Sequence, residues 1–294
     1  MSTVTIGIPT CYGGEALVDA VASIRASSVQ PDHIIICADR TPLSPKVQQG
    51  LEALGATVIW NEVQGSQFKK LKQIVDRVTT DLFVFTQDDI LFDKHTLKNI
   101  VRAFEFDDAV TLVGARVMPL RPVTMFEATM ATMVRMNDRI GRFWNAGQNH
   151  LLASGRCLAF RTATIQAGRL PEEVINGDMF LYLENKRIGK KFAYAEDAAV
   201  WIRCPQHLQD QLGPSSRYQY SQEEMSAYFN RNLSEEYAMP RSIIVRAGLV
   251  ELTGHPFAVF GYALVFCYTR LRRQQKRQVS SIVWDVDSST KKIH

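Results

Sequence analysis

This 294-residue sequence has no CxxC pair, no basic region followed by an apolar core in its first residues, and no membrane-length apolar run. The five cysteines stand alone, without a CxxC pair, which argues against a disulfide framework or a zinc site and favours a reducing compartment. The first residues lack a basic region followed by an apolar core, so we expect no signal peptide and a cytoplasmic protein. The longest apolar run, 257–268, is shorter than the roughly 20 residues that span a bilayer.

The common nucleotide-binding and hydrolase motifs are absent as well. No GxGxxG follows the first predicted strand, and the sequence has no GxxxxGK[ST], GxSxG or HExxH. A protein that binds phosphates without these loops commonly uses a divalent cation held by carboxylates.

What the sequence does have is a globular composition with a small positive charge. It is 46% hydrophobic and 22% charged, which excludes disordered and collagen-like proteins. The net charge of +4 is too small for a dedicated nucleic-acid binder, so we expect no nucleic-acid partner. The charge is uneven, because residues 241–294 contain nine basic and three acidic residues.

The first half of the sequence alternates apolar strands with helices. Strands are predicted at 4–9, 33–38, 57–60 and 81–86, and each is followed by a segment of helical periodicity. This order predicts an α/β fold with a mostly parallel sheet flanked by helices. Ligands of such sheets bind beyond the carboxyl ends of the strands. Those ends are Pro9-Thr10, Asp39, Asn61 and residues 87–89.

The second half is less regular. We expect strands at 110–117, 157–160, 192–195 and 199–202, a helix at 178–187, a polar loop at 206–216 and helices from 222 onward. Residues 125–140 fit either a helix or a loop. The expected organisation is one large domain over 1–240, with a first half of about 1–120 and a second half of about 121–240. A helical, basic extension follows over 241–294.

Two adjacent acids, Asp88 and Asp89, directly follow the fourth predicted strand. Neighbouring carboxylates repel each other, and a bound cation relieves that repulsion. Mg²⁺ or Mn²⁺ takes one or two carboxylates and completes its coordination with water and phosphate oxygens. The alternative is a solvated turn in which Asp89 caps the next helix, and the spacing alone leaves both interpretations open.

The order and spacing of these motifs resemble the family-2 glycosyltransferases of the GT-A fold, over roughly residues 3–202. The matching segments are Ile8-Pro9-Thr10 with Glu15, residues 83–89 at the aspartate motif, 155–161, Gly177-Asp178 and 189–200. The sequence also departs from the family pattern. Gln87 stands at the usual first aspartate, Asp39 is the one acid of the second-strand motif, Lys70-Leu71 replaces Arg-Asn, and Gly177 replaces the glutamate before Asp178.

The resemblance implies that a sugar is transferred, with inversion, from a nucleoside-diphosphate sugar to an acceptor hydroxyl. It makes Asp89 the ligand of Mn²⁺ or Mg²⁺ and Asp178 the catalytic base. The nucleotide-binding residues would be Pro9, Thr10, Glu15, Asp39, Lys70 and Asp88. It also implies that 1–240 is the catalytic domain, with the nucleotide-binding half at about 1–120 and the acceptor half at about 121–240. We expect a UDP-sugar donor and a glycan or lipid-linked acceptor.

Some residue roles have an alternative interpretation. Asp178 also fits a helix N-cap after Asn176-Gly177. His207 fits either a third metal ligand or a solvated loop residue. Arg203 and Arg217 fit diphosphate contacts or ordinary surface charges.

Two other functions stay open at this point. An inactive, glycosyltransferase-like scaffold would explain Gln87 and Gly177, although Asp89 and Asp178 argue against it. A nucleotidyltransferase should carry a basic glycine-rich loop after the first strand, and residues 11–15 contain no basic residue.

The C-terminal extension combines a short apolar helix with a basic cluster. Apolar residues recur at helical spacing over 256–271, and the adjacent basic residues are Arg270, Arg272, Arg273, Lys276 and Arg277. This pattern is typical of a helix in the plane of an anionic membrane surface. We therefore expect peripheral contact with the inner face of the membrane through residues 256–277. The alternative is a helix packed on the catalytic domain with a solvated basic end.

Overall fold

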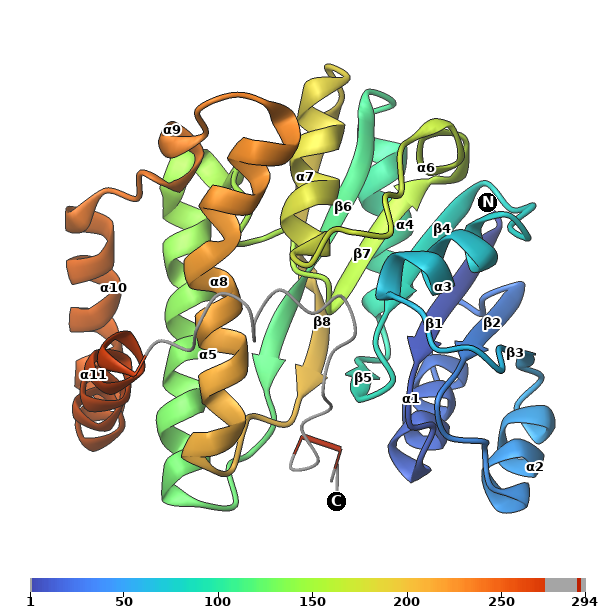
Figure 1. Ribbon diagram of the computed structural model, residues 1–294, viewed down its shortest axis with the longest axis horizontal. Coiled ribbons are helices and arrows are strands. Elements are labelled where there is room, and N and C mark those ends of the chain that lie inside the picture. Colours follow the sequence, from blue (N-terminus) through green and yellow to red (C-terminus); the bar gives the residue numbers. More distant parts are fainter. Residues whose placement is uncertain (1, 273–289, 292–294) are drawn as a thin grey trace.

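The computed structural model describes residues 2–272 and 290–291 (Figure 1). Its centre is an eight-stranded sheet in the order β3-β2-β1-β4-β7-β6-β8-β5. Most neighbouring strands are parallel, whereas β7 is antiparallel to β4 and β6, and β5 is antiparallel to β8. Helices flank this mixed, mostly parallel sheet, which confirms the predicted fold class.

The elements have the following bounds. The strands are β1 (Val4–Thr10), β2 (His33–Ala38), β3 (Thr57–Trp60), β4 (Leu82–Thr86), β5 (Ile90–Phe92), β6 (Val110–Pro119), β7 (Cys157–Arg161) and β8 (Lys191–Ile202). The helices are α1 (Glu15–Arg25), α2 (Pro45–Ala53), α3 (Gln67–Val75), α4 (Thr96–Phe106), α5 (Met125–Phe143), the 3₁₀ turn η1 (Trp144–Gly147), α6 (Thr162–Ala167), α7 (Gly177–Arg187), α8 (Leu208–Phe229), α9 (Ser234–Tyr237), α10 (Arg241–Gly254) and α11 (Pro256–Leu271).

The strands are apolar on both sides because helices cover both faces of the sheet. On one face Ile6 and Ile8 pack in a core with residues of α1 and α4. On the other face Phe83 and Phe85 pack in a second core with residues of α3 and α7. Leu82 and Val84, which alternate with them in β4, belong to the first core. Because both sides of the strand are buried, its sequence is a continuous apolar run.

The ends of several strands meet at one edge of the sheet. In the parallel register Thr10 lies opposite Ala38, and Ala38 lies opposite Trp60. Strand β7 begins at this edge because it is antiparallel to β4, with Cys157 opposite Thr86. The residues that follow β1, β2, β3 and β4 and those that precede β7 therefore share this carboxyl edge.

The structure differs from the predicted elements in the second half. Residues 208–216 are the start of helix α8, so the predicted polar loop at 206–216 is wrong. The apolar side chains that anchor α8, including Met225 and Tyr228, lie in its later turns, and helix propagates from them through a polar beginning. Residues 125–140 are helical, and the two strands expected at 192–195 and 199–202 are one strand, β8, with a register irregularity against β6.

The C-terminal extension is helical in its described part, as predicted. Both α10 and α11 pack against α5, at the end of the molecule away from β3 (Figure 1). Ala247 of α10 packs with Met136 and Ile140. Gly261 allows α11 to approach α5, because a Cβ atom there would lie 2.8 Å from Thr129 Oγ1. Residues 273–289 and 292–294 of the predicted extension lie outside the described residues.

Candidate functional site at the carboxyl edge

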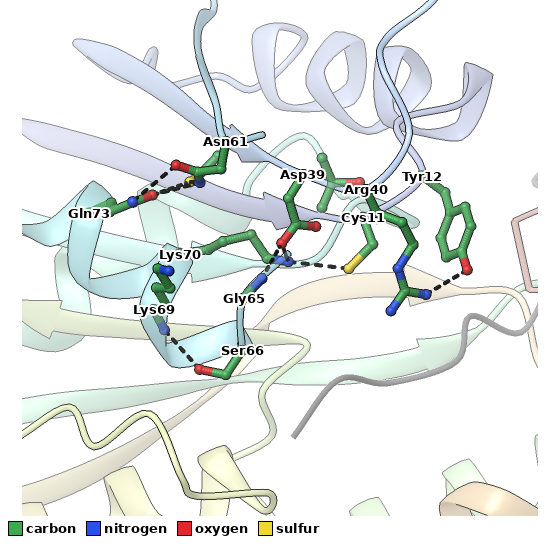
Figure 2. A network of polar contacts seen from close by, with 12 residues as sticks. Cys11, Tyr12, Asp39, Arg40, Asn61, Gly65, Ser66, Lys69, Lys70 and Gln73 are labelled. Atoms are coloured by element: carbon green, nitrogen blue, oxygen red, sulfur yellow. Dashed lines mark hydrogen bonds and ion pairs between the residues drawn. The ribbon is translucent and has the colours of Figure 1, made fainter. Parts of the chain in front are cut away.

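A buried ion pair lies beyond the end of β2 (Figure 2). Lys70 Nζ of α3 is 2.8 Å from Asp39 Oδ2, and the two side chains are 3% and 0% exposed. The Gly65 N–H donates to the same oxygen at 2.9 Å, and Lys70 also donates to Cys11 Sγ at 3.2 Å. A lysine on the buried face of α3 is tolerated because Asp39 neutralises its charge.

The second carboxylate oxygen of Asp39 is available to a ligand. Asp39 Oδ1 is buried and has no hydrogen-bond partner among the described residues. Leaving a buried acceptor unpaired costs about 1–3 kcal/mol, and a ligand N–H would remove that cost. The geometry therefore fits the predicted role of Asp39 as a nucleotide-binding residue, with Oδ1 as the acceptor.

Polar contacts hold α3 against the ends of β2 and β3 (Figure 2). The Ser66 hydroxyl accepts the Lys69 N–H at 3.1 Å and so caps the start of the helix. Asn61 and Gln73 exchange two amide hydrogen bonds of 2.8 and 3.1 Å. These contacts set the position from which Lys70 reaches Asp39.

Thr10 orients the first carboxylate of the acidic pair. The Thr10 hydroxyl donates to Asp88 Oδ2 and accepts the Gly13 N–H at 3.1 Å. Asp88 and Asp89 are both buried, and Asp89 Oδ1 has no hydrogen-bond partner among the described residues. The sequence predicts Thr10 as a nucleotide-binding residue; in the structure its hydroxyl positions Asp88.

A positive charge already lies at this pair. The Lys291 ammonium bonds to Asp88 Oδ1 and is 3.2 Å from Asp89 Oδ2, which also accepts the Thr290 hydroxyl at 3.2 Å. The two carboxylates thus hold a cation, and they are the oxygen ligands that Mn²⁺ and Mg²⁺ prefer. They fit the predicted metal site by their chemistry and by the unpaired Asp89 Oδ1.

Further protein ligands are not gathered around the acidic pair. Within residues 2–272 and 290–291, no three His, Cys, Asp or Glu side chains form a metal-binding cluster. His207 is exposed just before α8, and no such cluster among these residues includes it. A metal ion there would complete its coordination with water and phosphate oxygens.

Asp178, from the later half of the sequence, reaches the same edge. It lies in the first turn of α7 and accepts the N–H groups of Met179 at 2.9 Å and Gly155 at 3.4 Å. Gly155 is followed by Arg156, whose carbonyl accepts the Thr86 hydroxyl at 2.7 Å. Thr86 ends β4 and closely precedes the acidic pair. This sequence of contacts brings the predicted base and the predicted metal ligand to one edge.

The surroundings of Asp178 suit a proton acceptor. Burial raises the pKa of its carboxyl above the ordinary value, while the N–H groups of Met179 and Gly155 and the charge of Arg156 act in the opposite direction. The negative charge of Asp178 also raises the pKa of the Tyr218 phenol of α8. Asn176, and not Asp178, occupies the N-cap position of α7.

Not every predicted site residue joins these interior contacts. Pro9 is buried within β1, but Glu15 is exposed at the start of α1 and pairs with Lys46. Arg203, considered as a diphosphate contact, is buried with Glu127 at 3.0 Å. Glu15 therefore lies at the rim of the carboxyl edge, and Arg203 neutralises a buried acid.

Sequence reasoning missed the pair of Tyr12 and Arg40, which lies beside Cys11 (Figure 2). Arg40 donates to the Tyr12 hydroxyl at 2.6 Å, and its guanidinium carbon lies 5.1 Å from the ring centroid. Arg40 has a φ of 68°, which is uncommon for a residue other than glycine and is often found at functional sites. The sequence signal that could have identified Arg40 is its position directly after Asp39, a predicted nucleotide-binding residue.

A separate groove of about 730 Å³ lies elsewhere on the protein. It is lined by residues of α4 and β8, among them Arg102, Phe106 and Lys191, and contains none of the predicted site residues. The carboxyl edge is the better candidate for the functional site, because the unpaired carboxylate oxygens of Asp39 and Asp89 lie there.

The chain matches known proteins in its family and in its fold. Residues 3–233 match the family described as Glycosyltransferase like family 2. No curated protein matches the sequence. The structure is similar to the mannosyltransferase PcManGT from Pyrobaculum calidifontis, solved with GDP-Man and Mn²⁺, at 13% identity over 93% of this chain and 76% of that one, with a TM-score of 0.56.

A second solved structure, glucosyl-3-phosphoglycerate synthase from Mycobacterium tuberculosis with Mn²⁺, UDP and phosphoglyceric acid, is similar at 12% identity. The match covers 81% of this chain and 80% of that one, with a TM-score of 0.53. At such identities the similarity establishes the fold alone, and it confirms the GT-A fold.

The buried ion pair yields a stability prediction. Lys70→Met leaves the Asp39 carboxylate buried without its cation, so we expect a loss of about 3–5 kcal/mol in the free energy of unfolding, measured by urea denaturation. Lys69→Met, one residue away and less buried, should change it little. Adding Asp39→Asn to Lys70→Met should recover most of the loss. A Lys70→Met protein as stable as the wild type would contradict the assigned ion pair.

Proposed function

We propose, from the premise that the chain belongs to the family described as Glycosyltransferase like family 2, that it is a metal-dependent, inverting glycosyltransferase. It would transfer a hexose or related sugar from a nucleoside-diphosphate sugar to an acceptor hydroxyl in the synthesis of a glycan, polysaccharide or glycolipid. One observation carries the proposal. The unpaired acceptor of Asp39, the Asp88–Asp89 pair and Asp178 occupy a single edge of the sheet.

The donor would lie along this edge with its base towards Asp39 and its diphosphate towards Asp89. Asp39 Oδ1 would accept an N–H of the base, while the contact with Lys70 holds the Asp39 carboxylate in place. We favour a UDP-sugar, because uracil offers one such N–H. The similar structures were solved with UDP and with GDP-Man, so both bases belong in the test.

The transfer step assigns one task to each carboxylate. The acceptor oxygen would attack the anomeric carbon as the bond from that carbon to the diphosphate breaks, and the bonding electrons would leave with the diphosphate. Asp178 would take the proton of the acceptor hydroxyl. Asp89, with Asp88 beside it, would hold Mn²⁺ or Mg²⁺, which neutralises charge on the leaving diphosphate when bound. Direct displacement of this kind inverts the anomeric configuration.

The proposal includes the peripheral membrane contact that the sequence predicts. No described helix is both long and apolar enough to cross a bilayer. Helices α10 and α11 nevertheless expose many large apolar side chains. They are Ile244, Val245, Leu249, Val250 and Leu252 of α10, and Phe257, Phe260, Leu264, Phe266, Tyr268 and Leu271 of α11.

The two sides of α11 indicate what its outer face contacts. Tyr262 and Val265 pack inward against the main core, while Phe257 and Leu271 are 84% and 86% exposed. A helix that is apolar on both sides needs an apolar environment on its outer side too. Arg270 lies over the Phe266 ring at 5.0 Å, so positive charge borders this face.

This combination supports a helix pair lying in the plane of an anionic membrane. Basic residues near such a surface each contribute about 1 kcal/mol to binding. In the sequence Arg273, Lys276 and Arg277 extend the cluster; they lie outside the described residues. A protein docked in this way on the inner face would meet a lipid-linked acceptor, which is the acceptor class we favour. The five cysteines are free in the structure, which is compatible with the proposed location on the inner face.

Calorimetry with UDP, GDP and dTDP, each with and without Mn²⁺, tests the function and the residue roles together. We expect Asp89→Ala to abolish Mn²⁺-dependent nucleotide binding, because it removes the metal ligand. Asp178→Asn should bind donor normally and lose transfer by about 10²–10⁴-fold, because the proton acceptor is gone. The opposite pattern would show that the roles are exchanged. Absence of nucleotide binding by the wild type would favour the inactive scaffold.

The raised pKa of Asp178 predicts the pH dependence of transfer. A protonated carboxyl cannot accept a proton, so kcat should fall as the pH decreases through this raised pKa and reach a plateau above it. The measurement is kcat against pH at saturating donor, acceptor and Mn²⁺. The residual activity of Asp178→Asn should lack this acidic limb, and an acidic limb that persists in that variant would assign it to another group.

Vesicle flotation tests the membrane contact. Full-length protein should float with vesicles containing about one-third anionic lipid and float less with neutral vesicles. The double variant Phe257→Ser/Leu271→Ser should lose flotation, because it removes the two most exposed apolar side chains of α11. Phe106→Ser is the matched control, since Phe106 is 92% exposed on α4 and lies outside this face. Equal flotation of all three proteins would contradict the proposed contact.

A further inference from the structure

The last described residues of the chain occupy the acidic pair. Lys291 bonds to Asp88 Oδ1 and contacts Asp89 Oδ2, and Thr290 donates to the same Asp89 oxygen. The Lys291 side chain is 26% exposed, so most of its surface is enclosed. In Figure 1 this segment is the short red trace near the label of the C-terminus, separated along the chain from α11.

A metal ion and this ammonium group would require the same space. Mg²⁺ lies about 2.1 Å from a carboxylate oxygen, so an ion shared by Asp88 and Asp89 would overlap with the position of Lys291 Nζ. An ion bound through Asp89 Oδ1 alone would still lie a few ångströms from the ammonium. Two positive charges at that separation repel strongly at a site with little solvent.

We propose that the C-terminal segment is an internal, reversible competitor of the metal ion, with Lys291 as the competing cation and Thr290 as its second contact. The inference rests on the proposed function in one respect, namely that the acidic pair is the metal site. It adds a regulatory state in which the chain's own ammonium neutralises the pair and the metal is excluded.

The position of the segment along the chain permits such an exchange. Residues 273–289 separate α11 from Thr290, and 17 residues of extended chain span on the order of 60 Å. Lys291 can therefore leave the pair without moving α11. If Lys291 occupies the pair in nine of ten molecules, the apparent affinity for Mn²⁺ is about tenfold weaker than the intrinsic affinity.

The test measures metal binding without catalysis. Mn²⁺ binding to the full-length protein is followed by the electron paramagnetic resonance signal of the free ion, in the absence of donor. We expect Lys291→Ala to tighten binding about tenfold. Lys291→Arg should stay close to the wild type, because it keeps the positive charge. Lys190→Ala removes the same charge from an exposed loop at the far end of α7 and should have no effect.

A second measurement follows the contact itself. Acylation of lysines, mapped by mass spectrometry, should label Lys291 more slowly than the exposed Lys190 in the wild type. Added Mn²⁺ with UDP should speed the labelling of Lys291, and so should the double variant Asp88→Asn/Asp89→Asn. Labelling of Lys291 as fast as Lys190 in the wild type would overturn the contact.

The outcomes separate this inference from the proposed function. Equal Mn²⁺ affinity of the wild type and Lys291→Ala, with Asp89→Ala unable to bind, would overturn the competition and keep the metal site. Absence of Mn²⁺ binding in every variant, with or without UDP, would overturn the metal site and the competition with it. Tighter binding by Lys291→Ala that Asp89→Ala abolishes would support both.

Discussion

Buried carboxylates that require positive partners organise the carboxyl edge of the sheet. Asp39 is paired with Lys70, and the Asp88–Asp89 pair holds the Lys291 ammonium. Removing a charge from water is costly unless an opposite charge or several hydrogen bonds compensate it. The carboxylate oxygens that remain unpaired, Asp39 Oδ1 and Asp89 Oδ1, mark where a ligand would complete the compensation. The unpaired oxygens at this edge can therefore accept hydrogen bonds from a ligand or coordinate a cation.

The reversed strand β7 brings the two halves of the chain to this edge. Because it is antiparallel to β4, it begins where β4 ends, and the residues before it contact both Thr86 and Asp178. A wholly parallel sheet would have placed that beginning at the opposite edge. The mixed topology therefore brings the proposed metal ligand of the first half and the proposed proton acceptor of the second half to one edge, as the proposed sugar transfer requires.

The C-terminal extension, from α10 onward, contacts both α5 and the acidic pair. Helices α10 and α11 cover α5 with one side and expose apolar side chains on the other, while Thr290 and Lys291 reach the acidic pair. One short region of the chain therefore carries both the proposed membrane face and the proposed competitor of the metal. The distance along the chain between the two is long enough for each to act by itself.

The sequence by itself determined the first half of the fold, because strands buried on both faces read as apolar runs and the helices between them carry a clear period. It also placed Asp39, Asp88 and Asp89 at strand ends. Only the tertiary structure decided the rest. Residues 208–216 are polar, and they are helical because later turns of α8 are anchored in the core. Three contacts could not be predicted: Thr10 with Asp88, Lys70 with Asp39, and Lys291 with Asp88. Each joins residues that are 31 to 203 positions apart, and local sequence patterns carry no information about contacts at such separations.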